Sequence, residues 1–283
     1  MHEKNLNDEI QRAKELLQNV DAVLITAGAG MGVDSGLPDF RGREGFWKAY
    51  PMAKKLGLSF EELATPKWFE ENPRLAWAFY GHRLNLYRKT KPHKGFYLLK
   101  ELGEKKKGKY FVFTSNVDGQ FQKAGFEDKR IVEIHGSIHY LQCTIPCTDD
   151  IWSADGIEVI VDMEKFEAVG DLPKCIHCGG IARPNILQFF DFAFIPYRTE
   201  MALRRIGEWF DYLEDYGYKL AIIEIGAGKA VPTVRNFSEE IAYKYNTKVI
   251  RINPRDYDGP KDIVIPISMG GLEGIKAILQ DVE

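Results

Sequence analysis

The stretch from residue 22 to residue 41 constrains the fold of this chain more than any other. An apolar segment, Ala22–Ile25, runs directly into TAGAGMGVDSGLPDFR, which has closely spaced glycines at positions 28, 30 and 32. Glycine permits tight turns and lets backbone N–H groups approach a phosphate, so a strand followed by such a loop is typical of a nucleotide-binding α/β sheet. A bare Gly-Ala-Gly would equally fit an ordinary strand-to-helix turn.

The loop departs from the ordinary dinucleotide fingerprint. Val33 occupies the sixth position of G-x-G-x-x-G, and no clear strand ending in an acidic residue follows about 20 residues later. Asp39, Phe40 and Arg41 come directly after the glycines, which places a carboxylate and a guanidinium beside the expected phosphates. This arrangement favours chemistry on the nucleotide itself over a plain dehydrogenase.

Short apolar strands alternate with helical patterns along most of the chain. Apolar residues at helical spacing separate the predicted strands, and this alternation predicts an α/β fold with a doubly wound parallel sheet. The predicted strands are Ala22–Thr26, Tyr110–Ser115, Leu220–Ile225, Lys248–Ile252 and Asp262–Ile265.

Two stretches interrupt this alternation. Residues 42–90 show helical spacing and many aromatic residues but no strand, and residues 137–181 contain all the cysteines. We assign both stretches to a smaller helical and metal-binding domain. The Rossmann-like, nucleotide-binding domain then comprises residues 1–41, 91–136 and 182–283, with the ligand expected in the cleft between the two domains.

Composition indicates an enzyme of the cytoplasm. A formal charge of -3 and a pI of about 6.1 give no electrostatic case for binding nucleic acid. No apolar run reaches the roughly 18 residues that span a bilayer, and the amino-terminal segment is charged and amphipathic where a signal peptide would be apolar. We therefore expect no membrane association.

The four cysteines form two close pairs, C-x3-C and C-x2-C, joined by a long spacer. Two such pairs suit tetrahedral zinc, because each pair can supply two thiolates from one turn. A pair of disulfides or four separate buried thiols would be the alternatives. With four cysteine ligands no coordination position stays open, so a zinc ion here, or another thiophilic metal, would be structural; His139 and His177 are close enough to serve as alternative ligands. The predicted ligands are Cys143, Cys147, Cys175 and Cys178.

Three polar residues follow predicted strands. His135 ends the apolar run Ile131–Ile134, and histidine suits a general base at neutral pH, although a lone histidine after a strand is more often structural. Asn116 and Asp118 follow the Tyr110–Ser115 strand, where such residues also cap helices. We expect them to cap a helix that begins near residue 117.

Taken together, the motifs resemble those of the sirtuin family. The loop resembles GAGxSxxSGIPDFR, with Gly32 in place of serine, and TSNVD (residues 114–118) resembles TQNID. His135-Gly136, the cysteine pairs, Arg183-Pro184, Gly226–Gly228 and Ile252-Asn253 follow in family order, so the resemblance covers almost the whole chain. It implies NAD and zinc as cofactors and His135 as the base. The residues that it implies for NAD binding are Gly28, Ala29, Gly30, Asp39, Phe40, Arg41, Ser115, Asn116, Asp118, Gly226, Ala227 and Asn253.

The resemblance implies an NAD-dependent protein-lysine deacylase that releases nicotinamide and O-acyl-ADP-ribose from NAD and an acyl-lysine protein. Asn116 would hold the ribose, and Asp118 the nicotinamide amide. An ADP-ribosyltransferase or NAD hydrolase is the first alternative, and a non-catalytic NAD-binding module is the second. Four departures bear on this choice: Gly32, Ser115 and Gly228 lack family side chains, and Phe190 replaces the glycine of a substrate-facing FGE segment, where it would narrow the acyl-lysine channel.

The string AFYGHR adds an expectation about the acyl group. Tyr80 and Arg83 stand three residues apart on a predicted helix from Pro73 to Arg88, so they share one face. A surface aromatic and a solvated charge would explain a bare Tyr-x-x-Arg. Sirtuins that remove succinyl or malonyl groups have the same pair after a small alanine, here Ala64, and arginine can bind a carboxylate with two hydrogen bonds. The resemblance therefore implies Tyr80 and Arg83 as substrate-binding residues.

Overall fold

A six-stranded parallel sheet organises the larger part of the chain. We describe a computed structural model, in which residues 2–39, 42–280 and 282 are placed. The spatial strand order is β11-β10-β9-β1-β2-β3, and every neighbouring pair is parallel. The strands are β1 (Ala22–Ala27), β2 (Lys109–Thr114), β3 (Ile131–Glu133), β9 (Leu220–Ile225), β10 (Val249–Ile252) and β11 (Val264–Ile267).

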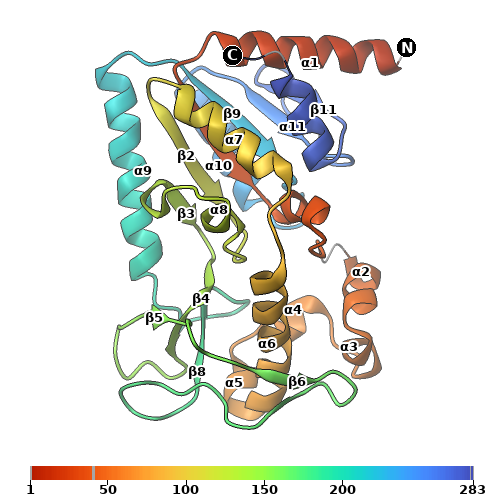
Figure 1. The fold of residues 1–283 in the computed structure, drawn as a ribbon, viewed down its shortest axis with the longest axis vertical. Coiled ribbons are helices and arrows are strands. Elements are labelled where there is room, and N and C mark those ends of the chain that lie inside the picture. The colour runs from red at the N-terminus through yellow and green to blue at the C-terminus, as the bar shows by residue number, and fades with distance from the viewer. Residues whose placement is uncertain (1, 40–41, 281, 283) are drawn as a thin grey trace.

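Helices cover both faces of this sheet, which confirms the predicted doubly wound α/β fold (Figure 1). Apolar residues of α1, α7 and α11 form one buried cluster with the sheet, and those of α9 and α10 form another. Because the strands alternate with covering helices, both sheet faces are apolar and the strands are almost entirely buried. The helices are α1 (His2–Gln18), α7 (Lys94–Lys105), α9 (Tyr197–Asp215), α10 (Thr233–Lys244) and α11 (Gly271–Leu279).

The chain order of the strands reverses at β1. The chain adds β2 and β3 on one side of β1, and later places β9, β10 and β11 on the other side. At such a switch point the loops after the two central strands diverge and leave a crevice beyond their carboxyl ends. The loops at residues 28–35 and 226–232 therefore flank the expected binding position.

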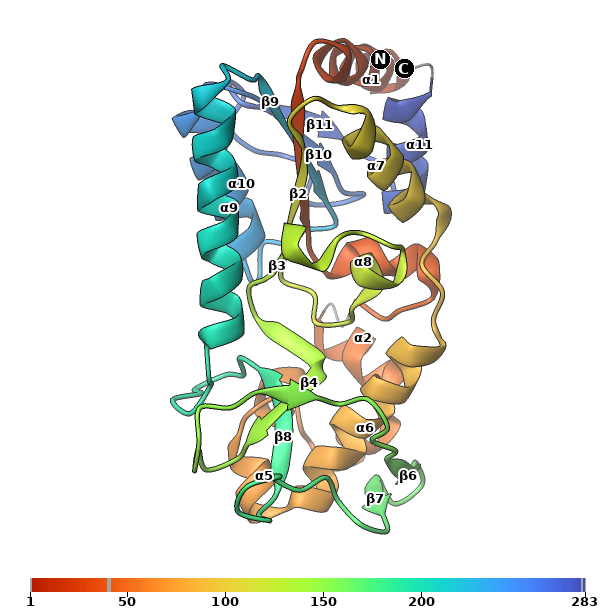
Figure 2. The same cartoon turned by 60° about the vertical axis from the view of Figure 1, so that its left-hand side comes forward.

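The two interrupting stretches build a smaller part below the sheet (Figure 2). Residues 42–90 contain helices and no strand, as predicted, and residues 136–186 form a three-stranded antiparallel sheet of order β5-β4-β8 and a β6-β7 hairpin. The helices are α2 (Gly42–Ala49), α3 (Pro51–Lys55), α4 (Phe60–Leu63), α5 (Lys67–Glu71) and α6 (Pro73–Lys89). The strands are β4 (Gly136–Cys143), β5 (Trp152–Ser153), β6 (Ile160–Asp162), β7 (Glu167–Val169) and β8 (Ala182–Ile186).

Several boundaries differ from the sequence prediction, those of β11 and of the domains by more than one residue. β11 begins at Val264 rather than Asp262, because the Pro260–Ile263 turn occupies the preceding residues. β8 pairs with β4 in the small sheet, whereas the predicted boundary placed residues from 182 onward with the large sheet. In the sequence ARPNI both faces are buried although Arg183 and Asn185 are polar; Arg183 pairs with Asp191, and Asn185 donates to Gln142.

Candidate functional site

Four loops meet where the central strands end. The side-chain amide of Asn116, after β2, donates to the Gly28 carbonyl after β1 at 2.9 Å. Asn253, after β10, donates to the Ala227 carbonyl after β9, also at 2.9 Å. The Gly30 N–H joins the two central loops by donating to the Gly226 carbonyl at 3.0 Å. The structure thus brings together predicted cofactor-binding residues from four separate segments.

The glycines after β1 have a different role from the one expected. The N–H groups of Gly28 and Gly30 donate to the carbonyls of Ile225 and Gly226, so these groups pair with β9 and its loop. A Cβ on Gly28 would lie 2.8 Å from the Ala227 Cα, and one on Gly226 would lie 2.4 Å from the Met31 nitrogen. Gly226 also has a φ of 64°. Glycine is required here because two backbones touch.

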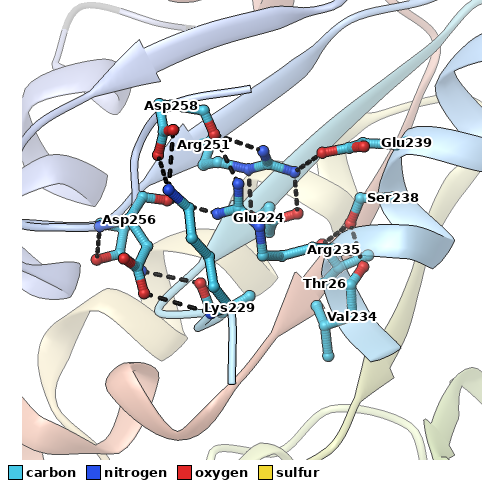
Figure 3. Close-up of polar contacts among 12 residues, drawn as sticks. Thr26, Glu224, Lys229, Val234, Arg235, Ser238, Glu239, Arg251, Asp256 and Asp258 are labelled. Carbon is cyan, nitrogen blue, oxygen red and sulfur yellow. Dashed lines mark hydrogen bonds and ion pairs between the residues drawn. The ribbon is translucent and has the colours of Figure 1, made fainter. Parts of the chain in front are cut away.

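A buried polar network fixes the loop that follows Asn253 (Figure 3). Arg251 forms two hydrogen bonds with Glu224, at 2.6 and 3.0 Å, and one with Glu239 at 2.8 Å. Its remaining Nη1 donates to the Asp258 carbonyl, and Arg235 donates to the carbonyls of Asp256 and Asp258. Two guanidinium groups therefore hold the backbone beside the β10 end, and the charges are compensated within the network.

Asn116 and Asp118 occupy different positions from those expected of helix caps. Gly119 is the N-cap of α8 (Gln120–Lys123), and Asn116 bonds to Gly28 instead of to this helix. Asp118 Oδ1 accepts from the Gln120 N–H at 2.9 Å, so Asp118 does support the first turn. Burial raises the pKa of Asp118 to about 6, although this hydrogen bond and the charge of Arg83 oppose the rise. The carboxyl is thus mostly ionised at pH 7 but takes up a proton at a higher pH than an exposed aspartate does.

His139 holds the turn that contains Asp118. Its Nε2 lies 3.0 Å from the Asp118 carbonyl oxygen, and its ring packs so closely on Gly119 that a Cβ there would lie 2.7 Å from it. Burial lowers the pKa of His139, which keeps the imidazole neutral. His139 is therefore a scaffold residue of this site. The sequence offered no signal for this contact, because it joins β4 to the loop before α8.

His135 follows β3 and precedes β4, in the space between the two sheets. Burial lowers its pKa below the ordinary value, and a hydrogen bond to the backbone of Ser115 opposes this shift. The backbone carbonyl of His135 accepts from Leu187 at 2.9 Å, which fixes the position of the residue against the segment after β8. The imidazole is neutral at pH 7, the protonation state that a general base requires.

The residues after the glycine loop are placed only in part. Asp39 Oδ2 lies 3.4 Å from Nη2 of Arg255, which comes from the loop after β10. Phe40 and Arg41, also predicted to bind the cofactor, lie outside the described residues. The Asp39–Arg255 contact spans the crevice between two loops distant in the sequence.

Tyr80 and Arg83 are both buried on α6, so the surface interpretation of this pair is wrong. The Arg83 guanidinium lies 5.1 Å from the centre of the Phe79 ring and 5.7 Å from that of Tyr80. Its Nε and Nη2 both donate to the Tyr87 hydroxyl, at 3.0 and 2.9 Å. Burial by itself lowers the pKa of Arg83, but the surrounding tyrosines, Tyr87 foremost, raise this pKa above its ordinary value. A permanent cation therefore lies inside an aromatic enclosure.

Phe190 does not fill the interior. Its side chain is 83% exposed, so it narrows no buried channel within the described residues. Phe189, one residue earlier, packs inward against Phe60 with ring centres 6.1 Å apart. The backbone turns between them because Phe190 adopts a φ of 56°.

The cysteines form one cluster at the tip of the small sheet. All four sulfur atoms lie within 4.8 Å of one another, with Cys143–Cys178 at 3.7 Å and Cys147–Cys175 at 3.6 Å. Disulfides are excluded, since a disulfide bond is about 2.05 Å long. Sulfurs bound tetrahedrally to zinc at about 2.3 Å lie about 3.8 Å apart, so the cluster fits this metal.

The two candidate histidine ligands are engaged elsewhere. His177 Nε2 contacts Asp150 at 2.8 Å, and His139 contacts the Asp118 carbonyl. Among the described residues, the four cysteines are the group that could hold a metal ion without either histidine. Among the helices that the structure describes, none is both long and apolar enough to cross a membrane.

Comparison with known proteins identifies relatives of this chain. A model of the Sir2 family matches residues 28–201. An NAD-dependent protein deacylase of Pyrococcus abyssi is 36% identical over 182 residues, 64% of this chain and 65% of the relative. An NAD-dependent protein deacetylase of Saccharolobus solfataricus is 36% identical over 177 residues, 62% of this chain and 63% of the relative.

The fold also matches solved structures. A Sir2 homologue in complex with NAD superimposes with a TM-score of 0.72 at 23% identity, covering 96% of this chain and 93% of that one. At this identity the likeness concerns the fold. The chain spans just under two thirds of the length of the first curated relatives that it matches.

Proposed function

Because the chain belongs to the Sir2 family, we propose that it is an NAD-dependent protein-lysine deacylase that yields free lysine, nicotinamide and O-acyl-ADP-ribose. The observation that carries this proposal is the convergence of Gly28, Asn116, Gly226 and Asn253 at the strand ends, with His135 and Asp118 in the adjoining loops. NAD supplies the ribose carbon that the acyl oxygen attacks as nicotinamide leaves, and one water molecule is consumed when the lysine amine is released. The partners of this chain are then an acyl-lysine protein and NAD.

The chain's residues have defined tasks in this reaction. His135 is the general base: one ring nitrogen is held at the Ser115 backbone, and the other accepts the ribose hydroxyl proton. Asp118 binds the nicotinamide amide from a buried position. Asn116 orients the ribose, because its own side chain is fixed by the Gly28 carbonyl.

Further residues complete the proposed cofactor site because of their positions in the sirtuin-like motifs. They are Ala29, Asp39, Phe40, Arg41, Ser115 and Ala227. Four thiolates would hold a structural zinc ion, which joins the two ends of residues 143–178. Thiols held as metal ligands, rather than as disulfides, suit the reducing cytoplasm, where we place the protein.

We further propose that Arg83 selects acyl chains that end in a carboxylate. A buried guanidinium among aromatic rings binds a carboxylate strongly, because little water is present to compete for its hydrogen bonds. The carboxylate of a succinyl or malonyl chain would share or replace the Tyr87 hydroxyl at Nε and Nη2. Tyr80 forms part of the enclosure through its ring.

Mass spectrometry of one reaction tests the function. The protein, NAD and a peptide bearing acetyl-, succinyl- or malonyl-lysine are mixed, and the products are weighed. Loss of the acyl group with formation of O-acyl-ADP-ribose is expected. A gain of ADP-ribose on protein would favour the transferase, and nicotinamide release alone the hydrolase.

Substitution of Arg83 tests the acyl preference. A hydrogen bond to a charged group contributes about 1.5–3 kcal/mol, so Arg83→Met should lower kcat/KM for succinyl and malonyl peptides about tenfold to a hundredfold relative to the acetyl peptide. Arg12→Met, which removes an exposed arginine from α1, is the matched control. Equal losses for all three peptides would refute the role of Arg83.

A further inference from the structure

Phe190 stands in an unfavourable conformation that its own packing does not explain. A φ of 56° is the left-handed region, where a bulky side chain is uncommon and costs free energy. The ring is also 83% exposed, so burial offers little compensation. An aromatic residue that is both strained and exposed suggests that its ring contacts something outside the chain.

A buried ion pair and hydrogen bonds hold the loop around Phe190 in place. Arg183 and Asp191 form a bidentate ion pair at 2.7 and 2.9 Å, with both side chains 0% exposed. Asp191 also accepts from the Ala193 N–H, and Gln142 donates to the Ala193 carbonyl. The exposed ring of Phe190 therefore projects from an ordered base and does not belong to a loose loop.

The same segment is continuous with the proposed acyl-binding enclosure. The Phe189 N–H donates to the Ala64 carbonyl at 3.0 Å, and the Phe189 ring contacts Phe60. Phe60 in turn lies 5.9 Å from the Arg83 guanidinium. Phe190 is thus the outer neighbour of the residues that surround Arg83.

A pocket of about 330 Å³ lies beside the Phe190 ring. Phe189 and Phe190 form one wall, and Glu61, Glu62 and Lys67 contribute charges to the other. The Lys67 ammonium lies over the Trp68 indole at 4.5 Å, and one Glu62 oxygen accepts from the Ser59 N–H as part of a helix cap. The pocket therefore combines an aromatic wall with an excess of one negative charge.

We propose that this pocket binds a lysine or arginine side chain of the substrate protein, a few residues from the acyl-lysine. The aliphatic stem of such a residue would lie along the Phe190 ring, and its cationic head would meet the Glu61 and Glu62 carboxylates. This inference rests on the proposed deacylase function, and it names the sequence that the enzyme prefers around the modified lysine.

Peptide kinetics test the inference. A panel places Arg, Ser, Leu or Glu in turn at each of the three positions on either side of one acyl-lysine. At one position we expect kcat/KM for Arg to exceed that for Glu by about tenfold at low salt, and the ratio to fall at high salt because exposed charges are screened. Glu61→Gln and Phe190→Gly should each reduce this ratio to about twofold.

Two controls separate binding from folding. Phe192→Ser removes another phenylalanine of the loop, 99% exposed and outside the pocket, and should keep the wild-type ratio. Phe190→Gly should not lower the thermal midpoint, since glycine accepts the left-handed conformation without strain. A lowered midpoint would assign Phe190 a structural role and overturn the inference.

Other outcomes are equally decisive. If kcat/KM does not depend on the flanking residue, or is highest with Leu, the proposal that the pocket binds a basic side chain is wrong. If no peptide loses its acyl group, the deacylase proposal fails; calorimetric titration of the Arg and Glu peptides into the protein then judges the pocket alone. Tighter binding of the Arg peptide that is weakened by Glu61→Gln would support it, and equal binding would refute it.

Discussion

Asn116 and Gly28 are joined by a hydrogen bond of 2.9 Å from the side-chain amide to the backbone carbonyl. This bond fastens the end of β2 to the loop after β1 and fixes the orientation of the Asn116 amide. A residue proposed to orient a ribose is thereby held by the loop that faces the same ligand.

Replacing Asn116 by alanine should affect both stability and cofactor use. The lost hydrogen bond should cost about 1 kcal/mol of unfolding free energy, and the loss of orientation should lower kcat/KM for NAD by at least tenfold. Denaturant unfolding and steady-state kinetics measure the two effects. Wild-type kinetics in a destabilised variant would remove Asn116 from the site.

Asp118→Asn should stabilise the fold at high pH while impairing function. The raised folded-state pKa, about 6 against an ordinary 3.8, contributes stability below the unfolded value, and this contribution is lost as pH rises through 6. Asparagine keeps the acceptor for Gln120 but does not ionise. Unfolding in denaturant should show similar stability at pH 4 and a gain of roughly 1–3 kcal/mol for the variant at pH 8. The same gain at both pH values would contradict this account.

His135→Ala should nearly abolish deacylation and preserve NAD binding. Removal of a positioned general base lowers the rate by about 10²- to 10⁴-fold. Turnover and calorimetric titration with NAD separate chemistry from binding, and added imidazole should restore part of the activity. If the variant stays active, His135 is not the general base.

Cys175→Ser should release the metal and loosen the module around residues 143–178. Metal binding and local folding are coupled, so the loss of one thiolate weakens both. Elemental analysis after dialysis measures the bound metal, and one zinc ion per chain is expected for the wild type. His177→Ala is the matched control, since it removes an imidazole that contacts Asp150 and keeps the backbone N–H that donates to Cys175 Sγ. Full zinc content in the cysteine variant would contradict a four-cysteine site.

The sequence predicts the large sheet well because its strands are buried on both faces. Leu220–Ile225 is predicted with the bounds that the structure shows, since its six consecutive residues are buried and all of them except Glu224 are apolar. The Cys pairs were equally informative, because metal ligands are brought together by local turns.

Long-range contacts account for what the sequence did not reveal. β8 contains Arg183, whose burial depends on Asp191, and the enclosure of Arg83 includes the Phe60 ring, which comes from α4 rather than from α6. The sequence also gives no sign that Gly28 touches the Gly226–Ala227 backbone, because that backbone belongs to the loop after β9. Patterns within one segment carry no information about such partners.

The contact between Gly28 and Gly226 has a consequence for biosynthesis. These glycines lie near opposite ends of the chain, and Asn253 must also be in place before the loops are fixed. During translation the amino-terminal glycine loop emerges early and can soon bond to Asn116, yet its partners Ile225 and Gly226 are made only late in synthesis. Closing so long a loop is entropically costly, so the crevice should be among the last parts to mature. A prematurely terminated chain would carry the family's best-known motif without a binding site.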